Sequence, residues 1–214
     1  MAMDWRAAWR AWTSYRSAGP AVQAFLVARM AVAPLGPLDP DFRSLRGRVL
    51  SLGCGHGAVD RYLAEINPDV TIDGVDLDEK RVCVAQATEH KQPRVRVRVA
   101  DVRRLDERGA YDAALAIDVL HHVEAPLHGE VAGALRDALR PGGTLLVKEM
   151  ATTPRRQYLW NRAHDRIVAK EEIHCRSPEN MARVIEEAGF EVEDVRRLKR
   201  LRIYPQYLVR ARRR

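Results

Sequence analysis

The stretch from Val49 to Gly57, VLSLGCGHG, constrains the fold of this chain more than any other feature. It begins with a short apolar run that is typical of a buried strand. Gly53, Gly55 and Gly57 then remove three Cβ atoms within five residues, so the backbone can take positive φ angles and a ligand can lie directly against it. A strand that ends in such a turn and leads into a helix is a ready site for a small polar ligand. The stretch therefore predicts a ligand-binding α/β fold.

The length of the chain, 214 residues without a linker rich in Pro, Gly or Ser, suffices for one well-buried α/β domain. We expect residues 1–44 to form a helical cap or lid and residues 45–214 to form the ligand-binding domain. With 46% hydrophobic and 30% charged residues and no apolar run of membrane-spanning length, the composition is typical of a soluble protein. Asp4, Arg6 and Arg10 interrupt the N-terminal segment, which argues against a signal peptide and favours a cytoplasmic location.

Cysteine usage and charge indicate the environment and the partners of the chain. Cys54, Cys83 and Cys175 form no CxxC pair, which fits a reducing compartment and argues against disulfides or a zinc site. The net charge of +7 is uneven, because residues 195–214 hold nine of the 36 basic residues and none of the 29 acidic ones. This basic segment is either an RNA-binding surface or a charged edge strand that discourages sheet pairing, and we favour the edge strand. Nucleic acid is therefore not the expected partner.

An aromatic stripe marks the N-terminal segment. Trp5, Trp9, Trp12 and Tyr15 recur at helical spacing within residues 3–16. The stripe allows three interpretations: a helix packed on the domain, a lid over the active site, or an interfacial helix in peripheral contact with a membrane. A second apolar helix is expected over residues 21–33, before a run of prolines.

From residue 48 onward, strand-like and helix-like segments alternate, which predicts right-handed βαβ units and a doubly wound parallel sheet. The strict alternation of residues 94–101 predicts a half-exposed edge strand, and the continuous apolar run of residues 111–119 predicts a central one. The segment Arg140 to Gly143 predicts a firm stop of the helix that precedes it. The expected strands are 48–53, 70–78, 94–101, 111–119 and 144–150, and the expected helices are 57–66, 79–90 and 125–139.

The C-terminal third has a different pattern. Residues 154–174 carry apolar side chains at helical spacing, and Ser177 followed by Pro178 predicts the start of another helix. Two strands follow at 191–198 and 206–212. Because only a short linker joins them, they are expected to form an antiparallel hairpin.

Four motifs resemble the class I S-adenosylmethionine-dependent methyltransferases over about residues 45–212. They are VLSLGCGHG, VDLDEK, VAD and LRPGGTLLVKE, in the family's order. The resemblance implies a Rossmann-like, mostly parallel sheet of seven strands in the order 3-2-1-4-5-7-6, with the last strand antiparallel and helices on both faces. It also implies an enzyme that uses S-adenosylmethionine and releases S-adenosylhomocysteine.

The resemblance further implies a set of cofactor-binding residues. Asp76 and Asp101 offer carboxylates to hydroxyl and amino groups of the adenosine. Ser51 departs from the family pattern, in which this position is often acidic, and it cannot pair ionically with the cofactor's ammonium group. The complete implied set is Ser51, Gly53, Cys54, Gly55, Gly57, Asp76, Leu77, Asp101, Val102 and Asp118.

A nicotinamide dinucleotide is the rival ligand. Gly53-x-Gly55-x-x-Ala58 satisfies the dinucleotide fingerprint, so the glycine turn alone does not decide between the two ligands. Only about 65 residues remain after the last parallel strand, which is too few for the usual substrate domain of a dehydrogenase. The length and the later motifs favour S-adenosylmethionine.

Acceptor-side residues are expected just beyond the carboxyl ends of the strands. His121 or His122 could be a general base, and Lys148 and Glu149 are either substrate-facing groups or an ordinary strand-end ion pair. Adjacent histidines do not converge readily and no third ligand is evident, so we expect no metal. The candidate catalytic residues are His121, His122 and Lys148. The candidate acceptor-binding residues are these three together with Trp12, Tyr15, Glu149 and His164, and Asp165 lies beside the last of them.

The acceptor class follows from what the segment Asp118-Val119-Leu120-His121 lacks. It does not carry the Asp/Asn-Pro-Pro-aromatic motif of nucleic-acid amino methyltransferases, and no cysteine stands in a Pro-Cys context. Asp118 and Lys148 partly match the residue set of ribose methyltransferases, which keeps RNA as an alternative. We favour a small or lipid-like acceptor methylated on oxygen, nitrogen or carbon; a non-catalytic regulator that binds S-adenosylmethionine is the other alternative.

Overall fold

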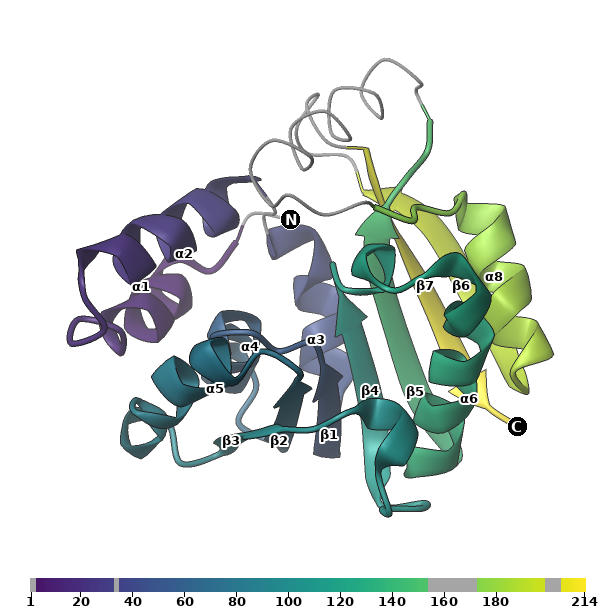
Figure 1. Cartoon of the computed structure of the whole chain (residues 1–214), viewed down its shortest axis with the longest axis horizontal. Coiled ribbons are helices and arrows are strands. Elements are labelled where there is room, and N and C mark those ends of the chain that lie inside the picture. The colour runs from purple at the N-terminus through teal and green to yellow at the C-terminus, as the bar shows by residue number, and fades with distance from the viewer. Residues whose placement is uncertain (1–2, 33–34, 154–172, 199–204) are drawn as a thin grey trace. The chain divides into compact units, whose positions relative to one another are not determined.

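The computed structural model describes residues 3–32, 35–153, 173–198 and 205–214 (Figure 1). Helices and strands alternate along the chain as expected. The helices are α1 (Trp5–Thr13), α2 (Pro20–Val32), α3 (Asp39–Ser44), α4 (Ala58–Ile66), α5 (Glu79–Gln86), α6 (His128–Ala138) and α8 (Pro178–Glu187). The strands are β1 (Gly47–Leu52), β2 (Val70–Asp76), β3 (Val95–Val99), β4 (Tyr111–Ile117), β5 (Leu139–Met150), β6 (Phe190–Leu198) and β7 (Gln206–Arg213).

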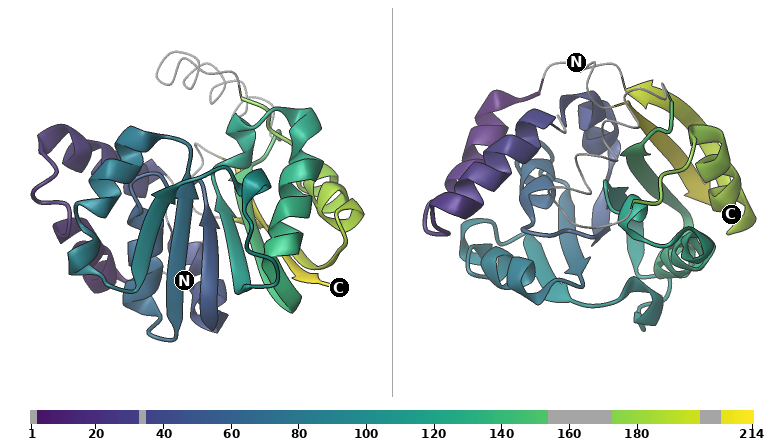
Figure 2. Two further views of the ribbon diagram at one scale, coloured as in Figure 1. Left: turned by 60° about the horizontal axis from the view of Figure 1, so that its bottom comes forward. Right: turned by 45° about the horizontal axis from the view of Figure 1, so that its top comes forward.

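The strands form a seven-stranded sheet in the order β3-β2-β1-β4-β5-β7-β6, which confirms the expected order. Figure 2 shows the strands from two further directions. β1, β2 and β3 pair in parallel, as do β4 and β5. β7 runs antiparallel to both β5 and β6, which confirms the C-terminal hairpin. The alternating strand β3 lies at one edge, and the basic strand β6 lies at the other.

One boundary prediction was wrong. The helix does end before the segment Arg140 to Gly143, because α6 stops at Ala138, but β5 begins at Leu139 and not at residue 144. The segment is a bulge within that strand. Tyr111 pairs with Leu139, but Ala113 already pairs with Thr144, so the intervening residues of β5 loop out of the ladder. Pro141 has no N–H to donate, and Gly142 has a φ of +75°, which together explain why the ladder breaks without the strand ending.

The described residues divide into two units, Met1–Asp101 and Val102–Arg214. The first unit contains α1, α2 and α3 together with β1, β2 and β3. The N-terminal residues 1–44, expected to form a cap, therefore belong with the first three strands. Among the helices of the described ranges, none has the length and apolarity that crossing a bilayer requires.

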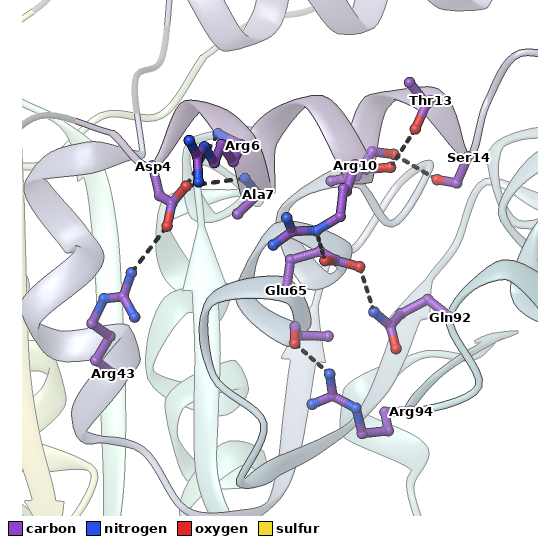
Figure 3. A network of polar contacts seen from close by, with 12 residues as sticks. Asp4, Arg6, Ala7, Arg10, Thr13, Ser14, Arg43, Glu65, Gln92 and Arg94 are labelled. Atoms are coloured by element: carbon purple, nitrogen blue, oxygen red, sulfur yellow. Dashed lines mark hydrogen bonds and ion pairs between the residues drawn. The ribbon is translucent and has the colours of Figure 1, made fainter.

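A polar network anchors α1 within the first unit (Figure 3). Asp4 caps the helix by accepting from the backbone amides of Arg6 and Ala7 at 3.1 and 3.0 Å. Arg10 donates to Glu65 of α4 at 2.5 Å, and Gln92 donates to the other oxygen of the same carboxylate at 2.8 Å. Asp4 also accepts from Arg43 of α3 at 3.4 Å, so the start and the end of α1 are both tied to the unit.

The helix packs through small side chains and not through its aromatic stripe. Ala7, Ala8 and Ala11 form its buried face, while Trp5 and Trp9 are 66% and 57% exposed. The helix is therefore packed on the unit through its alanines, which let α1 approach α4 closely. The lid and interfacial interpretations of its aromatic side chains stay predictions. Trp5 and Trp9 remain largely at the surface.

Candidate functional site

The turn after β1 is built for close approach of a ligand. Gly53, Gly55 and Gly57 have φ angles of +64°, +53° and +74°, a region that side-chain-bearing residues rarely adopt. A Cβ atom added at Gly55 would meet only Arg81 and Asp76, both at 3.9 Å. The turn is therefore held by backbone conformation, and the space beside Gly55 is available to a ligand.

Asp76, at the end of β2, organises this turn. Its Oδ2 atom accepts from the backbone amide of Gly55 at 2.7 Å, and its Oδ1 atom accepts from the amide of Asp78 at 2.8 Å. A carboxylate has about four acceptor positions, so two such bonds leave capacity for ligand hydroxyls. Leu77 next to it is 70% exposed, an apolar surface beside a polar one. A partly exposed carboxylate and an exposed aliphatic side chain fit the ribose and the adenine of S-adenosylmethionine.

Beneath the turn lie residues whose polar groups point into the protein. Ser51, only 4% exposed, donates its Oγ hydrogen to Oδ1 of Asp60 on α4 at 2.6 Å. Burial raises the pKa of the Cys54 thiol, so this cysteine stays protonated and is not a nucleophile. Asp60 was not a sequence candidate, because nothing in the spacing of α4 shows that this residue faces β1.

Tyr15 was predicted to face the acceptor, and the structure corrects this placement. The side chain is fully buried, its hydroxyl donates to the carbonyl oxygen of His56 in the turn, and it accepts from Nε of Arg61 at 2.9 Å. Arg61 also donates to the carbonyl oxygen of Ala85 and to Thr88. Burial raises the pKa of Tyr15, so its hydroxyl remains a donor. Tyr15 therefore supports the turn from within the unit.

Aromatic contacts involve both N-terminal helices, and one of them joins α2 to the glycine turn. The ring of Phe25 on α2 lies 5.3 Å from the ring of His56, and burial lowers the pKa of that histidine. Trp12, the other N-terminal acceptor candidate, is partly buried, and the centroid of its ring lies 4.9 Å from that of Trp9 on the same helix, with the two rings tilted by 39°. Its acceptor role stays a prediction.

The second unit carries a strained turn at the end of β4. Asp118 has a φ of +53° and is the one non-glycine residue with a positive φ within the described ranges. Both of its carboxylate oxygens accept from Nζ of Lys148, at 2.7 and 2.6 Å, and the lysine side chain has no exposed surface. Strained residues persist where their surroundings over-determine them, often at functional sites. Lys148 here holds the turn through a buried ion pair, and its catalytic role stays a prediction.

Glu149 organises the segment that follows. Its Oε1 atom accepts from the backbone amides of Val119 and Leu120 at 2.9 and 2.6 Å. Its Oε2 atom lies 2.6 Å from Nδ1 of His121, and both side chains are almost fully buried, at 2% and 7% exposure. A carboxylate on Nδ1 fixes the imidazole ring and directs its proton-accepting capacity to Nε2. This is the arrangement of a positioned general base.

A second histidine, which sequence reasoning missed, supports this segment. His128 at the start of α6 places Nε2 at 2.8 and 2.9 Å from the carbonyl oxygens of Leu120 and Val123, while its Nδ1 accepts from Arg176. Burial lowers the pKa of His128, which keeps it neutral with the proton on Nε2. By contrast, His122 is exposed, with its ring 4.1 Å from that of His121. The structure thus brings His121 and Glu149 together and leaves His122 outside the pair.

Two further cofactor candidates follow β3. Asp101 is partly exposed after β3, and Val102 is 4% exposed at the start of a short 3-10 turn. Their cofactor roles stay predictions. His164 and Asp165 lie outside the described residues.

Comparison with known proteins relates the chain to methyltransferases. A family model described as "Methyltransferase domain" matches residues 23–195. The ubiquinone biosynthesis O-methyltransferase of Xanthomonas campestris pv. campestris (strain B100) is 32% identical over 128 residues, or 56% of this chain and 52% of that protein. The tRNA U34 carboxymethyltransferase of Pseudoalteromonas atlantica is 33% identical over 117 residues, or 53% of this chain and 35% of that protein. The chain thus spans about half or less of the length of these curated relatives.

A solved structure confirms the fold. Geranyl diphosphate C-methyltransferase from Streptomyces coelicolor A3(2), crystallised with Mg²⁺, geranyl diphosphate and S-adenosyl-L-homocysteine, has a TM-score of 0.69. It is 15% identical to this chain, and the match covers 87% of this chain and 82% of that one. Since the family model covers most of the sequence, this chain belongs to the methyltransferase-domain family.

Proposed function

We propose that this protein transfers the methyl group of S-adenosylmethionine to a hydroxyl group of a small, lipid-like acceptor. The observation that carries the proposal is the buried pair of His121 and Glu149 after β4. Nitrogen or carbon acceptors need no base when a lone pair or an activated carbon is already available, whereas a hydroxyl group becomes a good nucleophile when a base removes its proton. A fixed imidazole therefore favours an oxygen acceptor.

The bound cofactor supplies an electrophilic methyl group on a cationic sulfur. The residues of the chain perform the other tasks. His121 accepts the proton of the acceptor hydroxyl at Nε2, and Glu149 stabilises the imidazolium that forms. Glu149 also accepts from the two backbone amides that follow Asp118. One carboxylate therefore positions both the base, His121, and the turn at the end of β4. Because this carboxylate is buried, water does not compete for its hydrogen bonds.

The direct test is transfer of a labelled methyl group to a panel of acceptors. The panel contains hydroxylated aromatic compounds with and without an isoprenoid tail, the corresponding amines, and tRNA. We expect labelled product from the tailed hydroxyl compounds and none from tRNA. Cofactor binding without any product would favour the non-catalytic regulator, and labelled tRNA would favour the RNA alternative.

The charges of the C-terminal hairpin also argue against RNA. Arg210 and Arg212 of β7 both pair with Glu193 of β6, at 3.1 and 2.6 Å, and Arg196 pairs with Asp194. Arginines engaged by carboxylates on the neighbouring strand offer less positive charge to a phosphate backbone. These pairs support the edge-strand interpretation of the basic segment.

The exposed tryptophans of α1 support a lipid-like acceptor that is reached at a membrane surface. Trp5 and Trp9 are one helical turn apart, and the exposed Arg6 lies between them in sequence. Tryptophan together with arginine on an exposed helix is typical of contact with an anionic lipid interface. We therefore propose that the protein works in the cytoplasm, peripherally attached to the membrane through α1.

Replacing both tryptophans with serine is expected to reduce binding to vesicles of anionic phospholipid by about tenfold or more, because the buried aromatic area is lost. Cosedimentation with vesicles measures this. A Val195→Ser variant, which removes an exposed apolar side chain from β6, is the matched control and should bind like the wild type. Unchanged vesicle binding by the double tryptophan variant would contradict membrane attachment through α1.

A further inference from the structure

A buried carboxylate without a complete set of partners lies beneath the glycine turn. Asp60, in the first turn of α4, has no exposed surface. Its Oδ1 atom accepts from Ser51, but its Oδ2 atom is buried and has no hydrogen-bond partner among the described residues. A buried acceptor left unsatisfied is costly, and a buried charge without a counter-ion more so. Such a group in a native protein calls for a functional explanation.

The local sequence makes room for this carboxylate beside the turn. A Cβ atom added at Gly74 of β2 would lie 2.9 Å from Oδ2 of Asp60 and 2.9 Å from Sγ of Cys54. Any other residue at this position would displace either the carboxylate or the turn. Because Gly74 has no side chain, the carboxylate of Asp60 can lie against the glycine turn from within the protein. The ligand is expected to lie on the opposite side of that turn.

Within the described residues, no ion pair neutralises Asp60. Its neighbour Arg61 directs Nε and Nη2 to Tyr15, Ala85 and Thr88, and no ion pair joins it to Asp60 in the described part of the chain. The other groups nearby are Cys54 and Tyr15, which burial keeps protonated, and the carboxylate of Asp76, which opposes a second negative charge. A cationic ligand would therefore be the favourable partner for an ionised Asp60.

We propose that Asp60 is the acidic residue that sets the affinity of the glycine turn for the cationic end of S-adenosylmethionine, acting from beneath the turn through Ser51. The acid is thus carried by α4, while the end of β1 carries only a hydroxyl. Asp60 is a positioning residue and does not touch the reacting atoms. The inference rests on the proposed use of S-adenosylmethionine and goes further by naming the residue that controls its binding.

The proposal makes cofactor binding depend on pH. Burial raises the pKa of Asp60 to about 6, against the hydrogen bond from Ser51 and the charge of Arg61, which lower it. Above this pH the carboxylate is charged and attracts the cation. Below it the carboxyl group is neutral, and binding must expel a proton, so we expect affinity to fall by about tenfold for each pH unit.

Calorimetric titration of the full chain with S-adenosylmethionine between pH 5 and pH 8 tests the proposal. We expect Asp60→Asn to weaken binding about 10- to 100-fold at pH 7.5 and to abolish the fall in affinity below pH 6. The exchange variant Ser51→Asp/Asp60→Ser keeps the same atoms in the pair and should restore most of the affinity. Asp73→Asn, which removes a carboxylate of β2 paired with Arg48, is the charge control and should bind like the wild type.

Each result has one interpretation. Thermal melting establishes that each variant is folded. A further measurement needs only the wild type: titrations in two buffers of different ionisation enthalpy report the protons released when S-adenosylmethionine binds. Wild-type affinity and an unchanged pH profile in Asp60→Asn would overturn the inference while leaving the cofactor site in place. Failure of the wild type to bind S-adenosylmethionine at all would overturn the proposed function together with the inference.

Discussion

Replacing Gly55 with valine is expected to weaken S-adenosylmethionine binding by at least about 100-fold while the protein remains folded. Gly55 has a φ of +53°, which a β-branched residue adopts only at a cost of about 1–2 kcal/mol or more. Its amide also donates to Asp76 at 2.7 Å, so a change of backbone angle breaks the bond that holds the carboxylate in place. The valine side chain would in addition occupy the open space beside the turn.

A matched control separates the loss of the site from backbone strain. Gly109 has a φ of +58° and nothing within 4 Å of an added Cβ atom, so Gly109→Val introduces the same strain away from the glycine turn. We expect both variants to lose similar thermal stability, and only Gly55→Val to lose cofactor affinity in calorimetry. Retained affinity in Gly55→Val would mean that the cofactor binds elsewhere.

Replacing His121 with alanine is expected to lower kcat about 10²- to 10⁴-fold, the usual contribution of a general base, with little change in cofactor affinity. The loss should be specific to hydroxyl acceptors, because an acceptor that is nucleophilic without deprotonation gains nothing from a base. Single-turnover kinetics with a labelled methyl group measures the chemical step directly.

Two neighbouring variants sharpen this result. His122→Ala removes an exposed imidazole next to His121 and is expected to leave kcat within a few-fold of the wild type. In Glu149→Gln, one acceptor oxygen is replaced by an N–H₂ donor. This donor then faces either His121 or the amides of Val119 and Leu120, all of which need an acceptor. We expect it to lower both kcat and the thermal midpoint. A larger loss of kcat in His122→Ala than in His121→Ala would reverse the assignment of the base.

The strand order illustrates what local patterns can predict. The continuous apolar run of β4 and the alternating pattern of β3 distinguish a central strand from an edge strand, because burial on two faces or on one face leaves different periodicities. The short linker before β7 requires an antiparallel hairpin. These are short-range properties, and the structure confirms each of them.

The stripe of aromatic residues in α1 illustrates where such patterns fail. Helical spacing shows that Trp5, Trp9 and Trp12 lie near one another, but it does not show whether that face is covered. The structure places Ala7 and Ala11 against the unit and leaves the first two tryptophans exposed. Tyr15 lies beyond the end of the helix and turns inward to the carbonyl oxygen of His56, a contact between residues 41 positions apart.

The fold class, the glycine turn and the acidic end of β2 can be recognised in the sequence, because strands, turns and their spacing depend on neighbouring residues. Which polar groups meet depends on how the elements pack in three dimensions. Asp60 joins Ser51 from the next helix, and Glu149 joins His121 across 28 positions of the chain. Such pairs form because two elements pack side by side, and packing partners cannot be inferred from the period of either element alone. The turn after β1 is therefore recognisable from its glycines, but the carboxylate of Asp60 beneath it is visible only in three dimensions.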